Sequence, residues 1–94
     1  MKKTKYIVKQ TTQFKREYKL AKKRGFDMQL LKDVVGKLAM GEPLPAKNCD
    51  HALSGKFATY RECHILPDWL LIYQVKENIL TLTLSRTGSH SDLF

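Results

Sequence analysis

Residues 57–84 read FATYRECHILPDWLLIYQVKENILTLTL, and this stretch predicts a β-sheet. Three segments have the alternating or continuously apolar pattern of strands: Phe57–Ile65, Leu70–Val75 and Ile79–Leu84. Leu66–Trp69 favours a type I turn between the first two, because proline presets the dihedral at the second turn position. Short connections of this kind are typical of antiparallel strands, and the polar segment Arg86–His90 is expected to leave the sheet.

A first helix is predicted ahead of these strands. Thr11 or Thr12 can cap a helix that runs to about Arg24, and Gly25 suits a left-handed residue at its end. A short strand over Lys5–Lys9 is expected to precede it.

A second helix is predicted to begin after Asp27, which is a good N-cap residue. Gly36 costs this helix about 1 kcal/mol unless it permits close packing, and Gly41 with Pro43 and Pro45 ends it. Its apolar stripe recurs at helical spacing: Leu30, Leu31, Val34, Val35 and Leu38. We therefore expect an α+β fold, in which two N-terminal helices form a hairpin on one face of a small antiparallel β-sheet, as a single domain over residues 1–94.

The charge of the chain is divided unevenly. The net charge is +8, yet residues 1–47 contain 13 Lys and Arg against four acids, whereas residues 48–94 contain four against five and all three histidines. This division indicates a basic docking surface and a separate chemical site. A solvated, lysine-rich helix is the plain structural alternative. The candidate residues for RNA or ribosome binding crowd the first predicted helix: Lys15, Arg16, Lys19, Lys22, Lys23 and Arg24.

The composition argues against export, a membrane span and a disulfide framework. The longest apolar run, Trp69–Tyr73, is too short to cross a bilayer, and the stretch Tyr6–Val8 is too short for a secretory signal. Cys49 and Cys63 make no disulfide framework and lack metal-ligand spacing. We therefore expect a cytoplasmic protein with no membrane partner, no cofactor and no bound metal.

A candidate chemical site follows from the pattern of polar residues. Glu62 and His64 point to the same face because they are two residues apart on one strand. Two or three histidines together can supply both a general base and a general acid near neutral pH. Attack of an RNA 2′-hydroxyl on its own phosphate needs those groups and a cation. The remaining candidates lie just before, between or after the strands: His51, Asp68, Arg86, His90 and Phe94.

Each candidate also has a structural explanation. A single histidine is often a satisfied polar side chain, Asp68 suits a turn, and Phe94 can anchor the tail. Glu62 can pair with a lysine across strands. Strict alternation from Leu84 directs Arg86 toward the apolar face, so a catalytic Arg86 requires a bulge or the end of the strand.

Three segments resemble motifs of a known family. Residues 50–55, DHALSG, resemble DHxLxG; residues 60–73, YRECHILPDWLLIY, resemble YR(D/E)xHxxPDWxLIY; and residues 86–94, RTGSHSDLF, resemble RTGxHxxLF. In this order and spacing they are similar to the signature of the YafQ-like branch of the RelE/ParE toxin superfamily. The similarity extends over about residues 14–94.

The resemblance implies two helices against an antiparallel sheet, and an mRNA endonuclease that acts in the ribosomal A site and is restrained by a cognate antitoxin. We expect this antitoxin to be acidic, because the toxin is basic. In the mechanism we infer, His64 and Asp68 act around the 2′-hydroxyl and His90 serves the leaving oxygen, with Phe94 against the mRNA. Glu62 stands where the best-known members have aspartate. The positions that match functional residues of the family are His51, Glu62, His64, Asp68, Arg86, His90 and Phe94.

Three other functions are consistent with parts of the sequence. A non-catalytic RNA- or ribosome-binding protein explains the charge division but gives no reason for the histidines. A metal-dependent nuclease would use His51, His64, His90 and an acid as ligands, although none of their local spacings is a familiar ligand pair. A gyrase-directed toxin would disturb DNA topology and leave messages intact.

Overall fold

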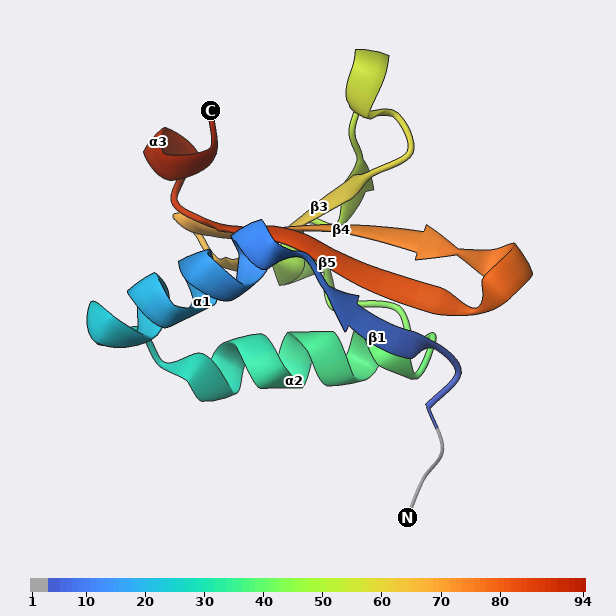
Figure 1. Ribbon diagram of the computed structural model, residues 1–94, viewed down its shortest axis with the longest axis horizontal. Helices are drawn as coiled ribbons and strands as arrows, with labels where there is room; N and C mark the ends of the chain where they lie inside the picture. The colour runs from blue at the N-terminus through green and yellow to red at the C-terminus, as the bar shows by residue number, and fades with distance from the viewer. Residues whose placement is uncertain (1–3) are drawn as a thin grey trace.

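A computed structural model describes residues 4–94, so residues 1–3 of the expected domain lie outside it. A five-stranded sheet has the order β1-β5-β4-β3-β2. Figure 1 shows α1 and α2 running in opposite directions along one face of this sheet, as expected, and α3 on the other side. The strands are β1 Ile7–Gln10, β2 His51–Ala52, β3 Arg61–Leu66, β4 Trp69–Lys76 and β5 Thr81–Gly88, and the α-helices are α1 Thr12–Lys23, α2 Met28–Ala39 and α3 His90–Leu93.

Both long helices begin and end at the residues that the sequence indicates. The Thr11 hydroxyl accepts the backbone N–H of Phe14 at 3.0 Å, and the Asp27 carboxylate accepts that of Gln29 at 3.1 Å. Gly25 adopts the left-handed conformation, with φ +84°, directly after the α1 C-cap. Local side-chain chemistry thus fixes where the chain turns from α1 into α2.

The packing explanation for Gly36 is wrong. A Cβ atom built at this residue would meet no atom within 4 Å. The glycine lies on an exposed side of α2, so it costs helix stability without permitting a closer contact.

One edge of the sheet differs from the expected antiparallel arrangement. β1 pairs with β5 in parallel, with Ile7 opposite Thr81, whereas the other three pairings are antiparallel. β1 begins at Ile7, two residues later than expected. The parallel pairing arises because α1 and α2 carry the chain across the sheet before β3, which leaves the first strand beside the last.

The strand boundaries after residue 50 also need correction. Phe57–Tyr60 is not a strand: Gly55–Phe57 forms a short 3-10 helix, η2, and β3 starts only at Arg61. Ile79 belongs to another 3-10 helix, and β5 continues to Gly88 instead of ending at Leu84. The longer β5 keeps Arg86 inside the sheet.

The core lies between the helices and one face of the sheet. Phe14, Leu31 and Leu38 pack against sheet residues that include Trp69 and Tyr73. The alternate side chains, among them Glu62 and His64, belong to the opposite face, as the strand pattern predicts. No helix within residues 4–94 is long and apolar enough to cross a membrane.

Candidate active site

Two histidines flank a buried carboxylate on the face of the sheet that the helices leave free. Glu62 is 6% exposed, and its Oε1 lies 3.6 Å from His51 Nε2 and 3.8 Å from His64 Nε2. His51 reaches this carboxylate because β2 pairs with β3 and places His51 directly opposite Glu62. The sheet register therefore places one carboxylate against two imidazoles.

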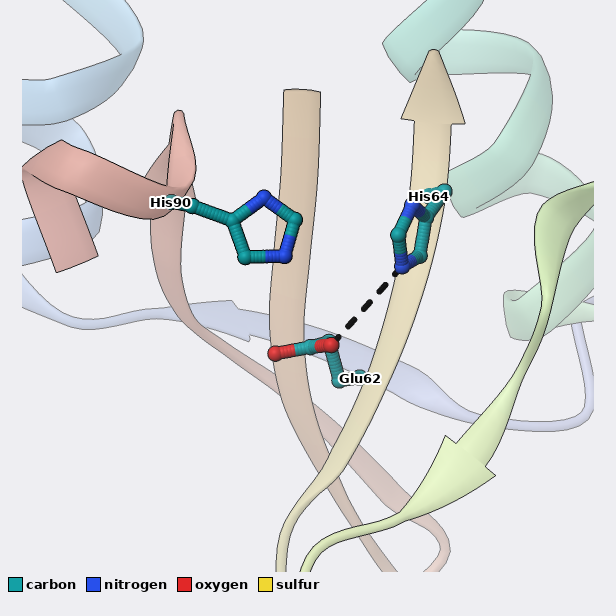
Figure 2. A group of neighbouring side chains, drawn as sticks. All are labelled: Glu62, His64 and His90. Carbon is teal, nitrogen blue, oxygen red and sulfur yellow. Dashed lines mark ion pairs between the residues drawn. The ribbon is translucent and has the colours of Figure 1, made fainter. Parts of the chain in front are cut away.

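The third histidine comes from α3. The His90 ring centroid lies 5.7 Å from that of His64, at an interplanar angle of 60°. Figure 2 shows His90 reaching toward His64 and Glu62 from the start of α3. These three residues, which we call the histidine–glutamate cluster, bring together groups that are 28 residues apart in the chain.

Asp68 belongs with His90 and not with His64. Its Oδ1 lies 3.3 Å from His90 Nδ1 and 3.3 Å from the His90 backbone nitrogen. His64 Nδ1 instead lies 3.3 Å from the carbonyl oxygen of Pro67. The two imidazoles therefore have separate partners, and each partner sits in or beside the β3–β4 turn.

A capping box holds His90 at the start of α3. The Ser89 hydroxyl accepts the Asp92 backbone N–H, while the Asp92 carboxylate accepts the Ser89 backbone N–H at 3.0 Å. Hydrogen bonding to Ser89 lowers the pKa of Asp92, and Arg24 of α1 forms an ion pair with the same carboxylate at 3.2 Å. Helix α3 is short, but both its first turn and its contact with α1 are fixed.

A β-bulge decides the position of Arg86. Tyr73 pairs with Leu84 and the preceding Ile72 pairs with Arg86, so Ser85 is an extra residue in β5. The shift by one residue moves Arg86 out of the apolar series and into a cross-strand row with Ile72 and Glu62. The bulge that a catalytic Arg86 requires is present.

Glu17 of α1 holds the Arg86 guanidinium. Its carboxylate accepts hydrogen bonds from Arg86 Nη2 at 2.7 Å and from Arg86 Nε, and also from the Thr87 backbone N–H at 3.2 Å. This hydrogen bonding raises the pKa of Arg86. The Glu17 side chain is 11% exposed and that of Arg86 37%, so part of the guanidinium remains open to solvent.

The other predicted residues lie around this cluster. Phe94 follows α3 and is 69% exposed, so it is no core anchor. The six basic residues proposed for docking are all exposed along α1 and beyond its end, although Arg24 is paired with Asp92. They lie on the helix layer, whereas Glu62 and His64 belong to the opposite face of the sheet. His90 comes from α3, which lies on that opposite side (Figure 1).

Three supporting residues are not among the candidates from the sequence. Ser89 and Asp92 have the S-x-x-D spacing of a capping box, which identifies the start of a helix just before His90. For Glu17 the sequence gives a weaker indication: it is the only acidic residue within the basic helix α1.

Cys63 has no role in this chemistry. It is fully buried on the core side of β3, and burial raises its pKa to about 12. A thiol of this kind is a packing residue and not a nucleophile.

The histidine–glutamate cluster also has the composition of a metal site. Glu62, His64 and His90 each offer one ligand atom, and these atoms lie within 4.8 Å of one another. Imidazole nitrogen and carboxylate oxygen suit Zn²⁺ or Cu²⁺. His51, a ligand in the metal-nuclease alternative, is not part of this group among the described residues.

The fold places the chain among the RelE-like bacterial toxins, the class that its three motifs resemble. In the crystal structure of the E. coli DinJ–YafQ toxin–antitoxin complex, a chain 38% identical superimposes with a TM-score of 0.88, over 96% of this chain and 98% of that one. A metal-bound toxin from Helicobacter pylori superimposes with a TM-score of 0.90 at 46% identity, over 95% and 99% of the two chains.

Sequence comparison narrows the class to one family. The profile described as "Bacterial toxin of type II toxin-antitoxin system, YafQ" matches residues 6–94. The mRNA interferase toxin YafQ of E. coli K12 is 42% identical over 83 residues, which are 87% of this chain and 88% of that protein. The chain belongs to the YafQ family of bacterial toxins.

Proposed function

We propose that this toxin is an endoribonuclease that cuts mRNA, most effectively on the ribosome, by metal-independent general acid–base catalysis. One observation carries the proposal: His64 and His90 lie 5.7 Å apart between ring centroids, each beside its own carboxylate. Two imidazoles at this separation can serve the two oxygens on opposite sides of one phosphate. A relative that is 42% identical over 83 residues is named an mRNA interferase toxin, which supports this class of activity.

In this mechanism His64 is the general base. With its Nδ1–H donated to the Pro67 carbonyl oxygen, Nε2 carries the lone pair that takes the proton of the 2′-hydroxyl. The imidazolium that forms then faces Glu62, which offsets its charge. The 2′-oxygen bonds to phosphorus, and the bond from phosphorus to the 5′-oxygen breaks.

His90 is the general acid. Protonated His90 donates Nδ1–H to Asp68, which leaves its Nε2–H free for the departing 5′-oxygen. Because Asp68 pairs with His90, we propose that it acts on the leaving-group side and not around the 2′-hydroxyl. The products are a 2′,3′-cyclic phosphate and a 5′-hydroxyl.

The remaining residues assist. Arg86 stabilises the charge that develops on the phosphate, because part of its guanidinium remains exposed beside Glu17. His51 orients Glu62, and Phe94 packs against the mRNA. The exposed cations of α1 bind RNA or rRNA: Lys15, Arg16, Lys19, Lys22, Lys23 and Arg24.

We expect the partner that restrains the toxin to be an acidic antitoxin. Both proteins are expected to act in the cytoplasm, and the toxin is expected to be a single domain over residues 1–94. A relative has been crystallised in a toxin–antitoxin complex, which supports a cognate partner for this chain. Association with the partner should slow as salt rises, because complementary charges steer the encounter.

A defined message in a translating extract tests the proposal by primer extension. In-frame cuts are expected with the parent protein and none with His64→Ala. Intact messages with stalled translation would favour a non-catalytic ribosome-binding protein, and altered plasmid topology would favour a gyrase-directed toxin.

Metal binding is a second candidate property of the same residues. It is favoured by the ligand cluster and by the metal-bound relative from Helicobacter pylori. Glu62, His64 and His90 would hold the ion, which could supply Lewis acidity at the phosphate. A nuclease that needs such an ion loses activity in a chelator, whereas the acid–base mechanism does not.

A further inference from the structure

An apolar groove lies next to the histidine–glutamate cluster. It has a volume of about 500 Å³ and is open to solvent. It lies between residues 53–60, which include η2 and which we call the η2 arm, and the end of α3 with Phe94. Figure 1 shows α3 and the η2 arm on the same side of the sheet, away from α1 and α2. Its lining includes Leu53, Phe57, Tyr60, Ile72, Arg86 and Phe94, together with residues at the start of α1.

The sheet register fixes the distance between this groove and the histidine–glutamate cluster. Ile72, on the groove floor, pairs with Glu62 on one side and with Arg86 on the other. The neighbouring row on the same face contains His64 and Leu70. Two rows on one face of a sheet are about 7 Å apart along the strand, so the groove begins beside the position of the scissile phosphate.

The composition of the groove fits a flat aromatic ligand that is attached to a phosphate. Phe57 is 48% exposed and Phe94 69% exposed, and both line the groove. Tyr60 lies against Phe57 with ring centroids 6.5 Å apart. Arg86 lines the groove. Lys56 is a second cation beside one of its aromatic rings, with Nζ 5.3 Å from the Phe57 ring centroid.

A nucleobase matches these features better than a peptide. Bases stack on exposed aromatic rings regardless of sequence, and the adjoining phosphates pair with arginine and lysine. The acidic antitoxin would place carboxylates on the same cations but would leave the exposed phenylalanine faces without a stacking partner.

From this geometry we infer that the groove is a nucleobase-binding subsite, which holds a base flanking the scissile phosphate against Phe57 and Phe94. The inference rests on the proposed ribonuclease function and extends it. Phe57 then becomes a determinant of substrate binding, although it takes no part in proton transfer.

Binding of an uncleavable RNA tests the subsite independently of catalysis. The probes are short RNA oligonucleotides with a 2′-deoxy residue at the cleavage position and, in a matched set, an abasic residue on one side or the other of the scissile phosphate. They are presented both free and as the codon on programmed ribosomes. An abasic residue at the subsite position should weaken binding about 10-fold.

A double-mutant comparison separates stacking from a general loss of affinity. Phe57→Ala should weaken binding of the intact RNA by the same factor and leave binding of the abasic RNA unchanged. Ile79→Ala is the control, because Ile79 is also exposed, at 54%, but lies at the β4–β5 turn. It should bind both RNAs as the parent does.

Two results would overturn the subsite. Equal losses for Phe57→Ala on intact and abasic RNA would show that no base occupies the groove. Loss of antitoxin binding with unchanged RNA binding would assign the groove to the antitoxin. Failure of the catalytic proposal is a different result, in which the binding comparison holds but His64 and His90 variants still cut RNA.

Discussion

Glu17 on α1 accepts two hydrogen bonds from Arg86 on β5, with Oε2 2.7 Å from Nη2. This contact links the basic helix to the cross-strand row that contains Glu62. Two hydrogen bonds to one carboxylate fix the orientation of the guanidinium plane as well as its position. The Arg86 side chain can therefore bind a phosphate without rearrangement.

Replacing Glu17 tests this link. Glu17→Ala should lower the single-turnover cleavage rate about 10-fold, because Arg86 is no longer positioned, and should reduce the free energy of unfolding by about 1–2 kcal/mol, because the Thr87 N–H loses its acceptor. The decisive comparison is made in an Arg86→Ala background. There Glu17→Ala should not slow cleavage further; an equal additional loss would mean that Glu17 does not act through Arg86.

His90 is expected to be a proton donor and not a structural residue. His90→Gln keeps a hydrogen-bonding side chain but cannot transfer a proton near neutral pH, so single-turnover cleavage should fall by about 10²–10⁴-fold. Thermal unfolding should be nearly unchanged, since His90 is exposed. Cleavage within a few-fold of the parent would move the acid–base role to His51 or His64.

Docking should be separable from chemistry. Lys15→Glu and Lys19→Glu combined on α1 should weaken RNA or ribosome binding and flatten its dependence on salt, because fewer counterions are released. The cleavage rate at saturating toxin should stay close to that of the parent. Lys32→Glu with Lys37→Glu, at exposed sites of α2, provides a matched control. Equal losses from both sets would indicate non-specific attraction only.

Added metal should inhibit this toxin. An ion held by Glu62, His64 and His90 would occupy the imidazole lone pairs that proton transfer requires. Cleavage should therefore fall on titration with Cu²⁺ or Zn²⁺ and return with EDTA, and EDTA alone should not reduce it. Activation by either ion after chelation would support the metal-dependent nuclease instead.

Gly36 offers a stabilising substitution. Because a Cβ meets open space there, Gly36→Ala should raise the free energy of unfolding by about 0.5–1 kcal/mol through the lower entropy of the unfolded chain. Differential scanning calorimetry would register this as a higher Tm. Gly25→Ala should do the opposite, because Gly25 has φ +84°. A neutral or destabilising Gly36→Ala would contradict the open environment.

The sequence predicts best what local chemistry decides. Thr11 and Asp27 cap helices where their side chains can accept a backbone N–H two or three residues on, and this needs no knowledge of the rest of the fold. The shared face of Glu62 and His64 follows from strand periodicity in the same way.

What depends on pairing between distant segments could not be predicted. The extra residue Ser85 exists only relative to the register of β4, so the bulge that redirects Arg86 has no local signal. The pairing of Asp68 with His90 similarly depends on where α3 folds back. Phe57 was assigned to a strand because its segment alternates, but Gly55, with φ +64°, starts a 3-10 helix there.

The parallel pairing of β1 with β5 also bears on how the chain acquires its structure. Ile7 must find Thr81 across almost the whole length of the polypeptide, a contact of high sequence separation that forms late and slows folding. The basic half and the histidine-bearing half of the chain therefore cannot fold as separate units. Recombination that exchanged one half between distant homologues would have to preserve the pairing of β1 with β5. The two halves are therefore expected to be inherited together.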